Sequence, residues 1–366
     1  MNLIAKKLVL QSMAEKASSI VSSTSKEIAP VLKNFHFEAR SEPKQLRMVA
    51  TDLDLSILEK TALVDVDEEG SAIIPAKKFL EIVKEAGDVD IRLATKDNVA
   101  TISTPTTKWT IKLMQGEYPS IPSTEDVAWS SIKSDIFIKA LRKVRNAVAK
   151  ESIRPELTLV MCDSSGVYAT DGARLHHAKE PIPVHIELQV SAVDDIIRIG
   201  RMSPNVDIGI AETDSHLLFD IGENIYMATK LQIPFPSITQ LAASGDKNDM
   251  ELQVDKEELD RAIKRARITA DEETNRLNLI LEDDSIMVVT RDKQDNSCEE
   301  RIKAYWKHPR TVCSVNWVYL KEAIQEMESK TIKILVGKKV GKRISPIVIS
   351  EDNFSATVLQ LRGLDA

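Results

Sequence analysis

Two short sequence phrases recur in this chain at nearly the same spacing, about one third of its length. The first, Val49-Ala50-Thr51-Asp52, returns as Tyr168-Ala169-Thr170-Asp171, an offset of 119. The second, Tyr118-Pro119-Ser120-Ile121, returns as Phe235-Pro236-Ser237-Ile238, an offset of 117, and a Lys-Leu pair precedes each copy. Two unrelated phrases that share one offset are hard to obtain by chance, so they indicate an internal repeat.

A fainter third copy supports a threefold repeat. Met287-Val288-Val289-Thr290 ends 120 positions beyond Thr170, and one third of the 366 residues is 122. A domain of about this length can bury its own core. The chain is therefore predicted to hold three tandem copies of one domain, at 1–124, 125–247 and 248–366.

Each copy is predicted to be an α+β unit, because two amphipathic helices lie among alternating strands rich in Val and Ile. The expected helices are 7–21 and 76–85, then 135–149 and 192–202, and finally 256–269 and 318–327. The expected strands include 45–50, 99–103, 108–113, 157–161, 216–219, 278–281, 286–289 and 332–336.

Composition excludes several classes of protein. Hydrophobic residues make up 43% and charged residues 29%, the balance of a soluble globular protein. No apolar run reaches membrane-spanning length and the first residues lack a signal core, so we expect a cytoplasmic location and no membrane partner. The three cysteines share no metal-ligand or redox spacing, and the adjacent His176 and His177 cannot share one face of a helix or strand. Neither a metal nor a cofactor is expected.

The distribution of charge points to a polyanion, although the net charge of -7 argues against one. Residues 133–154 carry seven Lys or Arg against two acids, and the helix 135–149 has one apolar and one cationic face. Basic residues recur on helices of all three copies: Lys84 in the first, Lys139, Arg142, Lys143, Lys150, Arg198 and Arg201 in the second, and Lys264 and Arg265 in the third. We expect these faces to form one basic surface suited to DNA.

The chain resembles the bacterial β sliding clamp family, the processivity subunit of the replicative DNA polymerase. Residues 169–175, Ala-Thr-Asp-Gly-Ala-Arg-Leu, are similar to that family's Ala-Thr-Asp-Gly-x-Arg-Leu signature. Residues 51–54, 74–79, 235–236 and 358–362 match in the same order. The resemblance implies a head-to-tail homodimer whose six domains close into a ring, with helices lining the hole. Such a ring is not an enzyme: it encircles double-stranded DNA without regard to sequence and confers processivity on the polymerase.

The resemblance also implies two kinds of site. Lys26 and Arg154 would contact tilted duplex. A pocket between the second and third domains would bind short linear peptides of the polymerase, the clamp loader and repair proteins. Its residues would be Leu157, Thr170, Gly172, Ala173, Arg174, Leu175, Pro236, Gln240, Leu241, Ile344, Pro346, Leu359, Gln360, Leu361 and Arg362.

Several positions depart from the family's pattern. Ala173 replaces a larger polar residue, Gln240 a basic one and Gln360 a proline, while Thr274 stands where some members place an aromatic ring. Residues 363–366 extend beyond the usual end. We therefore hypothesise a modified pocket, tuned to its own polymerase, that binds a generic clamp-binding peptide weakly.

Three other interpretations remain open to test. Asp52 and Asp54 could form the carboxylate pair of a phosphatase, but the other two copies do not preserve the pair. The stretch 337–343 superficially resembles a phosphate loop, but Arg343 occupies the position of the Ser or Thr that would hold magnesium. A repeat scaffold that binds only proteins would explain the triplication without using the basic helices.

Overall fold

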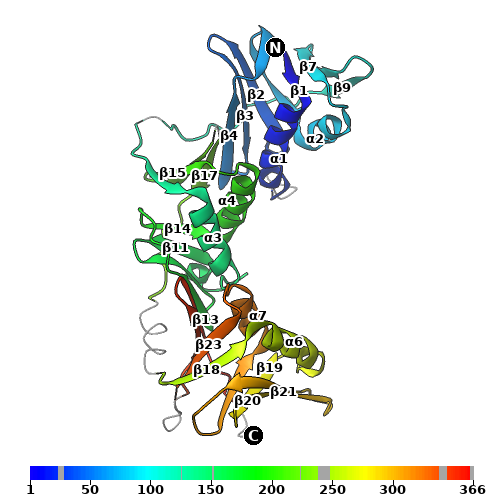
Figure 1. The fold of residues 1–366 in the computed structure, drawn as a ribbon. Helices are drawn as coiled ribbons and strands as arrows, with labels where there is room; N and C mark the ends of the chain where they lie inside the picture. Colours follow the sequence, from blue (N-terminus) through cyan, green and yellow to red (C-terminus); the bar gives the residue numbers. More distant parts are fainter. Residues whose placement is uncertain are drawn as a thin grey trace. The chain divides into compact units, whose positions relative to one another are not determined.

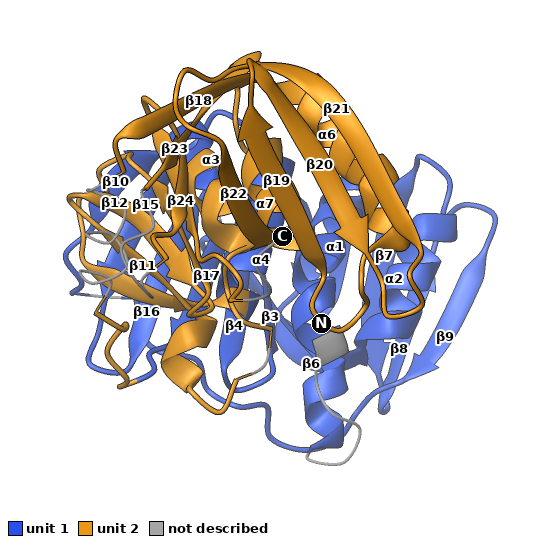
Figure 2. Ribbon diagram, turned by 90° about the horizontal axis from the view of Figure 1, so that it is seen from below, with its two compact units in different colours: residues 1–138, 191–231 blue, residues 139–190, 232–366 orange. Residues whose placement is uncertain are grey.

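The computed structural model describes residues 1–23, 29–124, 126–150, 152–222, 224–237, 248–337 and 344–362 (Figure 1). The chain divides into two compact units, which are coloured separately in Figure 2. Unit 1 is Met1–Ile138 with Ser191–Leu231, and unit 2 is Lys139–Val190 with Gln232–Ala366. The units therefore divide the middle third of the sequence between them, and residues 1–124, 125–247 and 248–366 remain a predicted division into domains.

The described helices fall where the sequence predicts them. They are α1 (Lys7–Ser23), α2 (Ala76–Glu85), α3 (Ser134–Arg145), α4 (Val190–Met202), α6 (Lys256–Ala266) and α7 (Trp317–Gln325). Three short 3-10 helices accompany them: η1 (Pro30–Lys33), η2 (Pro155–Thr158) and η3 (Arg267–Thr269).

Several expected element boundaries differ from the structure by two residues or more, and two of these differences lie near the predicted pocket. Helix α3 ends at Arg145 rather than at 149, because the next amides no longer bond one helical turn back: Ala147 N–H donates to Val144 O at 2.9 Å, and Ala149 N–H donates to Leu157 O at 3.0 Å. Leu157 itself lies in η2 rather than in a strand, and the strand begins at Leu159.

The described strands follow a similar order in each third of the chain, with one additional strand, β5, in the first third. In the first third they are β1 (Asn2–Lys6), β2 (Asn34–Ser41), β3 (Lys44–Thr51), β4 (Leu55–Thr61), β5 (Val64–Glu68), β6 (Gly70–Pro75), β7 (Asp90–Lys96), β8 (Val99–Ser103) and β9 (Lys108–Lys112). Next come β10 (Ser130–Lys133), β11 (Leu159–Asp163), β12 (Gly166–Thr170), β13 (Arg174–Ala178), β14 (Ile186–Gln189), β15 (Asp207–Glu212), β16 (His216–Ile221) and β17 (Asn224–Thr229). The last are β18 (Met250–Asp255), β19 (Arg276–Glu282), β20 (Ser285–Arg291), β21 (Ser297–Tyr305), β22 (Thr311–Asn316), β23 (Thr331–Val336), β24 (Ile347–Glu351) and β25 (Phe354–Val358).

Antiparallel pairing joins neighbouring thirds of the chain. In the eight-stranded sheet, with order β10-β15-β16-β17-β4-β3-β2-β6, β17 pairs with β4. In the twelve-stranded sheet, with order β14-β11-β12-β13-β25-β24-β23-β18-β21-β20-β19-β22, β25 pairs with β13. The third sheet, with order β5-β1-β7-β8-β9, contains only strands of the first third. The last strand of one third thus continues the sheet of the preceding third.

The repeated Thr-Asp phrase forms the same turn in its first two copies. Thr51 Oγ1 accepts from Leu53 N–H and Thr170 Oγ1 accepts from Gly172 N–H, both at 3.0 Å. The aspartate after each threonine accepts from two further amides, at 2.7–3.1 Å. The middle residue has positive φ in both turns, 84° at Leu53 and 89° at Gly172. This conformation suits glycine and strains leucine, so the second copy holds the relaxed form of the turn.

The two repeated phrases touch each other in the first copy. Thr51 N–H donates to Tyr118 Oη at 3.2 Å, and the Tyr118 hydroxyl donates to Asn34 O at 3.0 Å. The Tyr118 ring stacks on His36, with centroids 5.3 Å apart. Phe235 stands at the second copy's equivalent position and has no hydroxyl, so it cannot repeat these bonds.

Candidate functional site

The turn after β12 and the segment after β25 form one surface of unit 2. Leu359 N–H donates to Ala173 O at 2.9 Å, and Gln360 Nε2 donates to Ser345 O at 2.8 Å. A methyl group on Gly172 would lie 3.7 Å from Leu157 Cδ1, so these two residues are neighbours. The contacts bring residues 157, 172–173, 344–346 and 359–360 together although they are far apart in the sequence.

This surface offers apolar side chains to solvent above a buried floor. Ile344 and Leu359 are 36% and 37% exposed, whereas Thr170 and Leu175 are each 4% exposed and Leu157 is 6% exposed. Pro346 is buried, while Gly172 and Arg362 are exposed. Exposed aliphatic side chains around an open glycine suit the apolar anchors of a peptide.

Of the remaining predicted pocket residues, four are described and two lie outside the described part of the chain. Ala173, Pro236, Gln360 and Leu361 are half-buried. Leu361 N–H donates to Ser314 O at 2.7 Å, and Phe235 N–H, next to Pro236, donates to Glu187 Oε1 at 2.8 Å. Gln240 and Leu241 lie outside the described residues. No described contact therefore joins Pro236 to the turn at Gly172.

Arg174 supports this surface from below instead of lining it. Its side chain is buried, with Nε donating to Asp171 Oδ2 at 3.0 Å. Its two remaining nitrogens donate to Glu322 on α7 and to the carbonyl of Asn146. The guanidinium also lies over the Tyr319 ring, 4.3 Å from its centroid. Arg174, which the resemblance places among the pocket residues, fixes the turn to α7 and to the end of α3.

Sequence reasoning missed the residues that hold Arg174. Tyr319 and Glu322 lie three positions apart on α7, so they face the same side of that helix. A tyrosine and a glutamate at this spacing are a weak signal, because the same pair is common on solvated helices. Only the fold shows that both side chains meet Arg174, which is 148 positions from Glu322.

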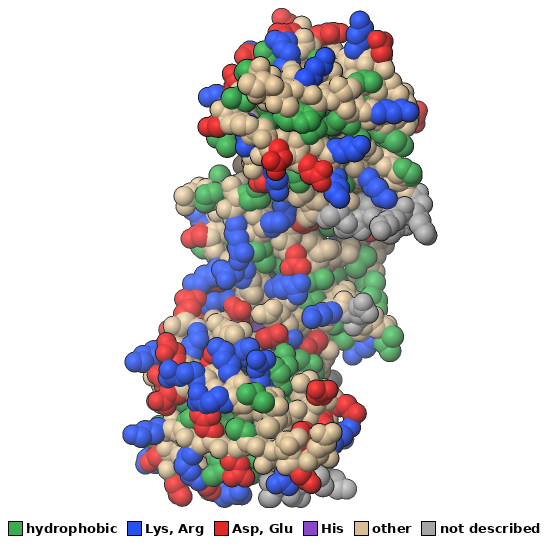
Figure 3. All heavy atoms as spheres, turned by 90° about the vertical axis from the view of Figure 1, so that its right-hand side faces the viewer, with side chains coloured by type: hydrophobic (Ala, Val, Ile, Leu, Met, Phe, Trp, Pro, Cys, Tyr) green, Lys and Arg blue, Asp and Glu red, His purple; other side chains and the backbone are tan. Residues whose placement is uncertain are grey.

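Most of the predicted DNA-facing cations are neutralised by nearby carboxylates, and Figure 3 shows Lys and Arg side chains interspersed with Asp and Glu. In unit 1, Lys84 lies 3.5 Å from Glu15. In unit 2, Lys139 lies 2.8 Å from Glu328, Arg154 lies 2.8 Å from Glu156 and Lys264 lies 2.5 Å from Asp260, while Arg265 pairs with Glu300. Exposed pairs of this kind contribute little to stability, so phosphate can replace the carboxylate at low cost.

Two predicted DNA contacts have a different role in the structure. Lys143 is 5% exposed, and its ammonium lies 2.9 Å from Glu328 and 3.2 Å from Glu351. Its assignment to the outward face of α3 was wrong, because the helix turns this position towards the strand hairpin that contains Glu351. Arg198 donates to the carbonyls of Glu15 and Lys16 at 3.1 and 2.6 Å and so holds α4 against α1.

Arg142, Lys150 and Arg201 are the predicted cations that remain available. All three are exposed, and no ion pair is described for them within the part of the chain that the structure covers. Lys26 lies outside the described residues. The available positive charge in the described residues is therefore small and lies on α3, on the segment that follows it and on α4, which suits weak contacts with phosphate.

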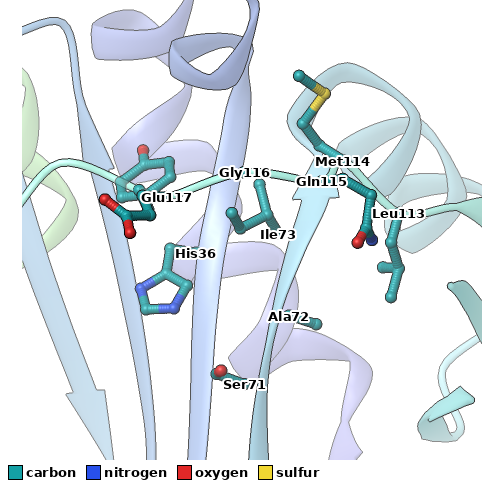
Figure 4. A pocket seen from close by; sticks show the side chains of 10 residues that line it. His36, Ser71, Ala72, Ile73, Leu113, Met114, Gln115, Gly116 and Glu117 are labelled. Carbon is teal, nitrogen blue, oxygen red and sulfur yellow. The ribbon is translucent and has the colours of Figure 1, made fainter.

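Other kinds of site are not supported in the described part of the chain. No group of three His, Cys, Asp or Glu could hold a metal ion there, and no helix there is long and apolar enough to cross a membrane. Asp52 accepts hydrogen bonds from the amides of its own turn, as a structural residue does. The phosphate-loop-like residues 338–343 lie outside the described range. A hollow of about 480 Å³ in unit 1, where residues 113–117 pass over β2 and β6 beside His36, contains no such group either (Figure 4).

Comparison with known proteins identifies the fold. Residues 1–122 match the family model described as DNA polymerase III beta subunit, N-terminal domain, and residues 246–361 match the model for its C-terminal domain. The beta sliding clamp of Synechococcus elongatus is 24% identical over 337 residues, covering 88% of each chain. The crystal structure of the DNA polymerase III subunit beta from Pseudomonas aeruginosa superimposes with a TM-score of 0.88 at 18% identity, covering 99% of this chain and 100% of that one.

The fold and the two domain matches define a DNA sliding clamp, a processivity factor of DNA replication. The chain belongs to the DNA polymerase III beta subunit family.

Replacing Arg174 tests whether it anchors the turn. Arg174→Ala leaves Asp171 and Glu322 without their partner, and we expect the free energy of unfolding to fall by about 3 kcal/mol or more. Chemical denaturation followed by circular dichroism measures this change. Arg142→Ala is the matched control and should shift it by about 0.5 kcal/mol or less. Equal losses in both variants would contradict the anchoring role.

The lysines around Glu328 predict a pH-dependent contribution to stability. Hydrogen bonds from Lys139 and then Lys143 lower the pKa of Glu328 to about 2, from an ordinary value of 4.5. A lowered pKa stabilises the fold above pH 4.5, and the contribution disappears as the pH falls towards 2. Glu328→Gln should therefore be less stable than the native chain at pH 7, and the difference should shrink between pH 4.5 and 2. Denaturant midpoints of the native chain and the variant over this pH range measure the difference. As a control, Glu272→Gln replaces an exposed glutamate, and its difference from the native chain should not shrink in this way.

Proposed function

We propose that two copies of this chain associate head to tail into a closed ring of six domains, which encircles duplex DNA and tethers the replicative polymerase. The ring would work in the cell interior, where the DNA is. The observation that carries this proposal is the junction between repeats. Within the chain, β17 pairs with β4 and β25 pairs with β13, each through five residue pairs.

In both junctions the last strand of one repeat pairs with a strand of the preceding repeat. The last strand of the first repeat has no preceding repeat in its own chain, so its partner would come from a second chain. By position in the repeat, β9 corresponds to β17 and β25, and β21 corresponds to β4 and β13. In the described residues β9 pairs only with β8, while β21 pairs with β20 from Ser297 to Lys303 and with β18 at Ala304 and Tyr305. Open strand edges favour addition of another strand. A partner chain that adds β9 to β21, twice over, would close the ring.

A ring that slides needs weak contacts with DNA. A net charge of -7 prevents strong attraction over the whole surface, and most predicted cations are already paired with carboxylates. Arg142, Lys150 and Arg201 supply flexible charges without base-specific groups. Retention would then depend on topology, and the contacts would only centre the duplex.

The tethering site would be the apolar surface of unit 2. Ile344 and Leu359 would receive the apolar side chains of a short linear peptide, and Gly172 would allow close backbone approach because no side chain blocks it. Leu361, Pro236 and the predicted Gln240 and Leu241 would extend the pocket. Ala173 and Gln360 would set the preferred peptide.

Charge reversal at Arg142 and Arg201 tests the DNA contacts. Because each phosphate contact releases counterions, the double variant should reduce the slope of log affinity against log salt by about 2. Fluorescence anisotropy of duplex DNA over a salt series measures the slope. Lys44→Glu with Lys307→Glu changes the net charge equally at exposed residues outside the predicted surface and should leave the slope unchanged. Equal reductions in the two double variants would contradict specific contacts at Arg142 and Arg201, and absence of DNA binding by the native chain would favour a scaffold that binds only proteins.

A peptide titration tests the pocket. A generic clamp-binding peptide should bind this chain more weakly than it binds the Pseudomonas aeruginosa clamp in the same calorimeter. Leu359→Asp should weaken it by a further tenfold or more, because a charge then faces the apolar anchor. Leu53→Asp is the matched control, since Leu53 is an exposed leucine in the equivalent turn of the first copy. Equal affinity for the two clamps would defeat the proposed tuning of the pocket.

A further inference from the structure

Two opposite charges remain unpaired on the strand edges that the proposed ring would join. Lys108 is the first residue of β9, and Glu299 is the third residue of β21. Both side chains are exposed, and no ion pair is described for either within the described ranges of the chain. Charged side chains on an open edge disfavour pairing with the wrong strand. They also favour the right strand where the register of the junction brings opposite charges together.

The register of such a junction follows from the hydrogen-bonded ladders of the three repeats. Each repeat has one strand that leads directly into its second helix, and the last residue of that strand holds the same place in every copy. Its partner on the neighbouring strand, and then the residue two positions after that partner, lead across to the next two strands. The pairs reached in the three copies are Val49–Leu58, Tyr168–His177 and Val289–Glu299. Leu58, His177 and Glu299 are therefore equivalent.

The ladders also give Lys108 its equivalents. Each repeat has another strand that leads directly into its first helix, and the same path runs from the last residue of that strand to its partner, two positions further and across. The pairs reached are Ser103–Lys108, Asp220–Ile225 and Ser350–Ser355. Lys108, Ile225 and Ser355 therefore hold the same place in the last strand of each repeat.

These equivalent places face each other at both junctions inside the chain. Ile225 pairs with Leu58 in the first junction, and Ser355 pairs with His177 in the second. When β9 of one chain is added to β21 of another in the same register, Lys108 lies opposite Glu299. Backbone pairing alone fixes this register, so the meeting of two opposite charges is an independent agreement with it.

The next pair along the junction agrees with the same register. In an antiparallel junction Trp109 would lie opposite Cys298, and both are only half-buried in the single chain. Their equivalents at the junctions inside the chain are all 0% exposed: Tyr226, Ile57, Ala356 and His176. A partner strand would cover Trp109 and Cys298 in the same way, and burial of the apolar indole ring favours association.

We propose that Lys108 and Glu299 of the partner subunit face each other across each ring-closing junction, and that this charge pair determines which chains associate. The proposal rests on the head-to-tail ring and adds its register. Residues directly opposite on antiparallel strands attract when their charges are opposite and repel when their charges are alike. A head-to-tail dimer contains the junction twice, so each substitution acts twice. The partner that fits is a second copy of this chain, because it offers the complementary charge on both edges.

Charge reversal on one edge tests the pairing. Lys108→Glu sets two acidic side chains against each other at both junctions, and Glu299→Lys sets two basic ones. We expect each variant to form homodimers with a dissociation constant at least about tenfold above that of the native chain. Sedimentation velocity over a concentration series measures this constant. Because both side chains are exposed, each variant should keep the native unfolding midpoint in circular dichroism.

Mixing the two variants gives the sharpest result. In a heterodimer of Lys108→Glu with Glu299→Lys, both junctions again join opposite charges, one in the native sense and one in the reversed sense. We therefore expect the mixture to form heterodimers at close to the native affinity and in preference to either homodimer. Native mass spectrometry with one variant isotopically labelled separates the heterodimer from the two homodimers.

A matched control reverses charges away from the two edges. Lys44→Glu and Asp214→Lys alter exposed side chains on β3 and on the turn between β15 and β16, and these variants should dimerise like the native chain and mix without preference. If the native chain dimerises but the edge variants behave like these controls, the charge pairing is wrong while the ring stands. If the native chain stays monomeric at every concentration, the ring and the charge pairing both fail.

Discussion

Strand pairing between consecutive repeats is the interaction on which the rest of this structure depends. β4 and β13 each follow a Thr-Asp turn, and each takes the last strand of the next third of the chain as its antiparallel neighbour. Without these pairings, four strands would present open edges to solvent, where they would invite aggregation. With them, each compact unit contains strands from two consecutive thirds of the chain, and the turn at residues 172–173 comes to lie beside residues 359–360.

The two junctions share a backbone and differ in their side chains. The first has Leu53 at the strained position of its turn and a buried Leu55 at the start of β4. The second has Gly172 and Arg174 at the same positions. Glycine relaxes the turn and leaves its surface open, while the arginine fixes it to α7 from below. One junction is therefore mainly structural, and the other has the features of a binding surface.

The likeness of the two Thr-Asp turns could be predicted from the sequence, because the phrase Ala-Thr-Asp occurs in both copies. The helices could be predicted for a similar reason, since a regular apolar stripe depends only on neighbours along the chain. The roles of Lys143 and Arg174 could not be predicted in this way. Their partners Glu351 and Glu322 are 208 and 148 positions away, so neither the helical spacing around Lys143 nor the signature that contains Arg174 could show these contacts. The end of α3 was missed because a distant carbonyl, that of Leu157, accepts from Ala149 N–H.

We propose that topology, through a closed ring, holds the protein on DNA. Retention of the loaded protein on closed circular duplex, measured before and after linearisation with a single-cutting nuclease, tests it most directly. We predict that the protein stays on the circle at moderate salt and is lost once free ends allow it to slide off. Equal retention on the circular and linear forms would contradict a topological hold, because contacts with DNA rather than a closed ring would then retain the protein.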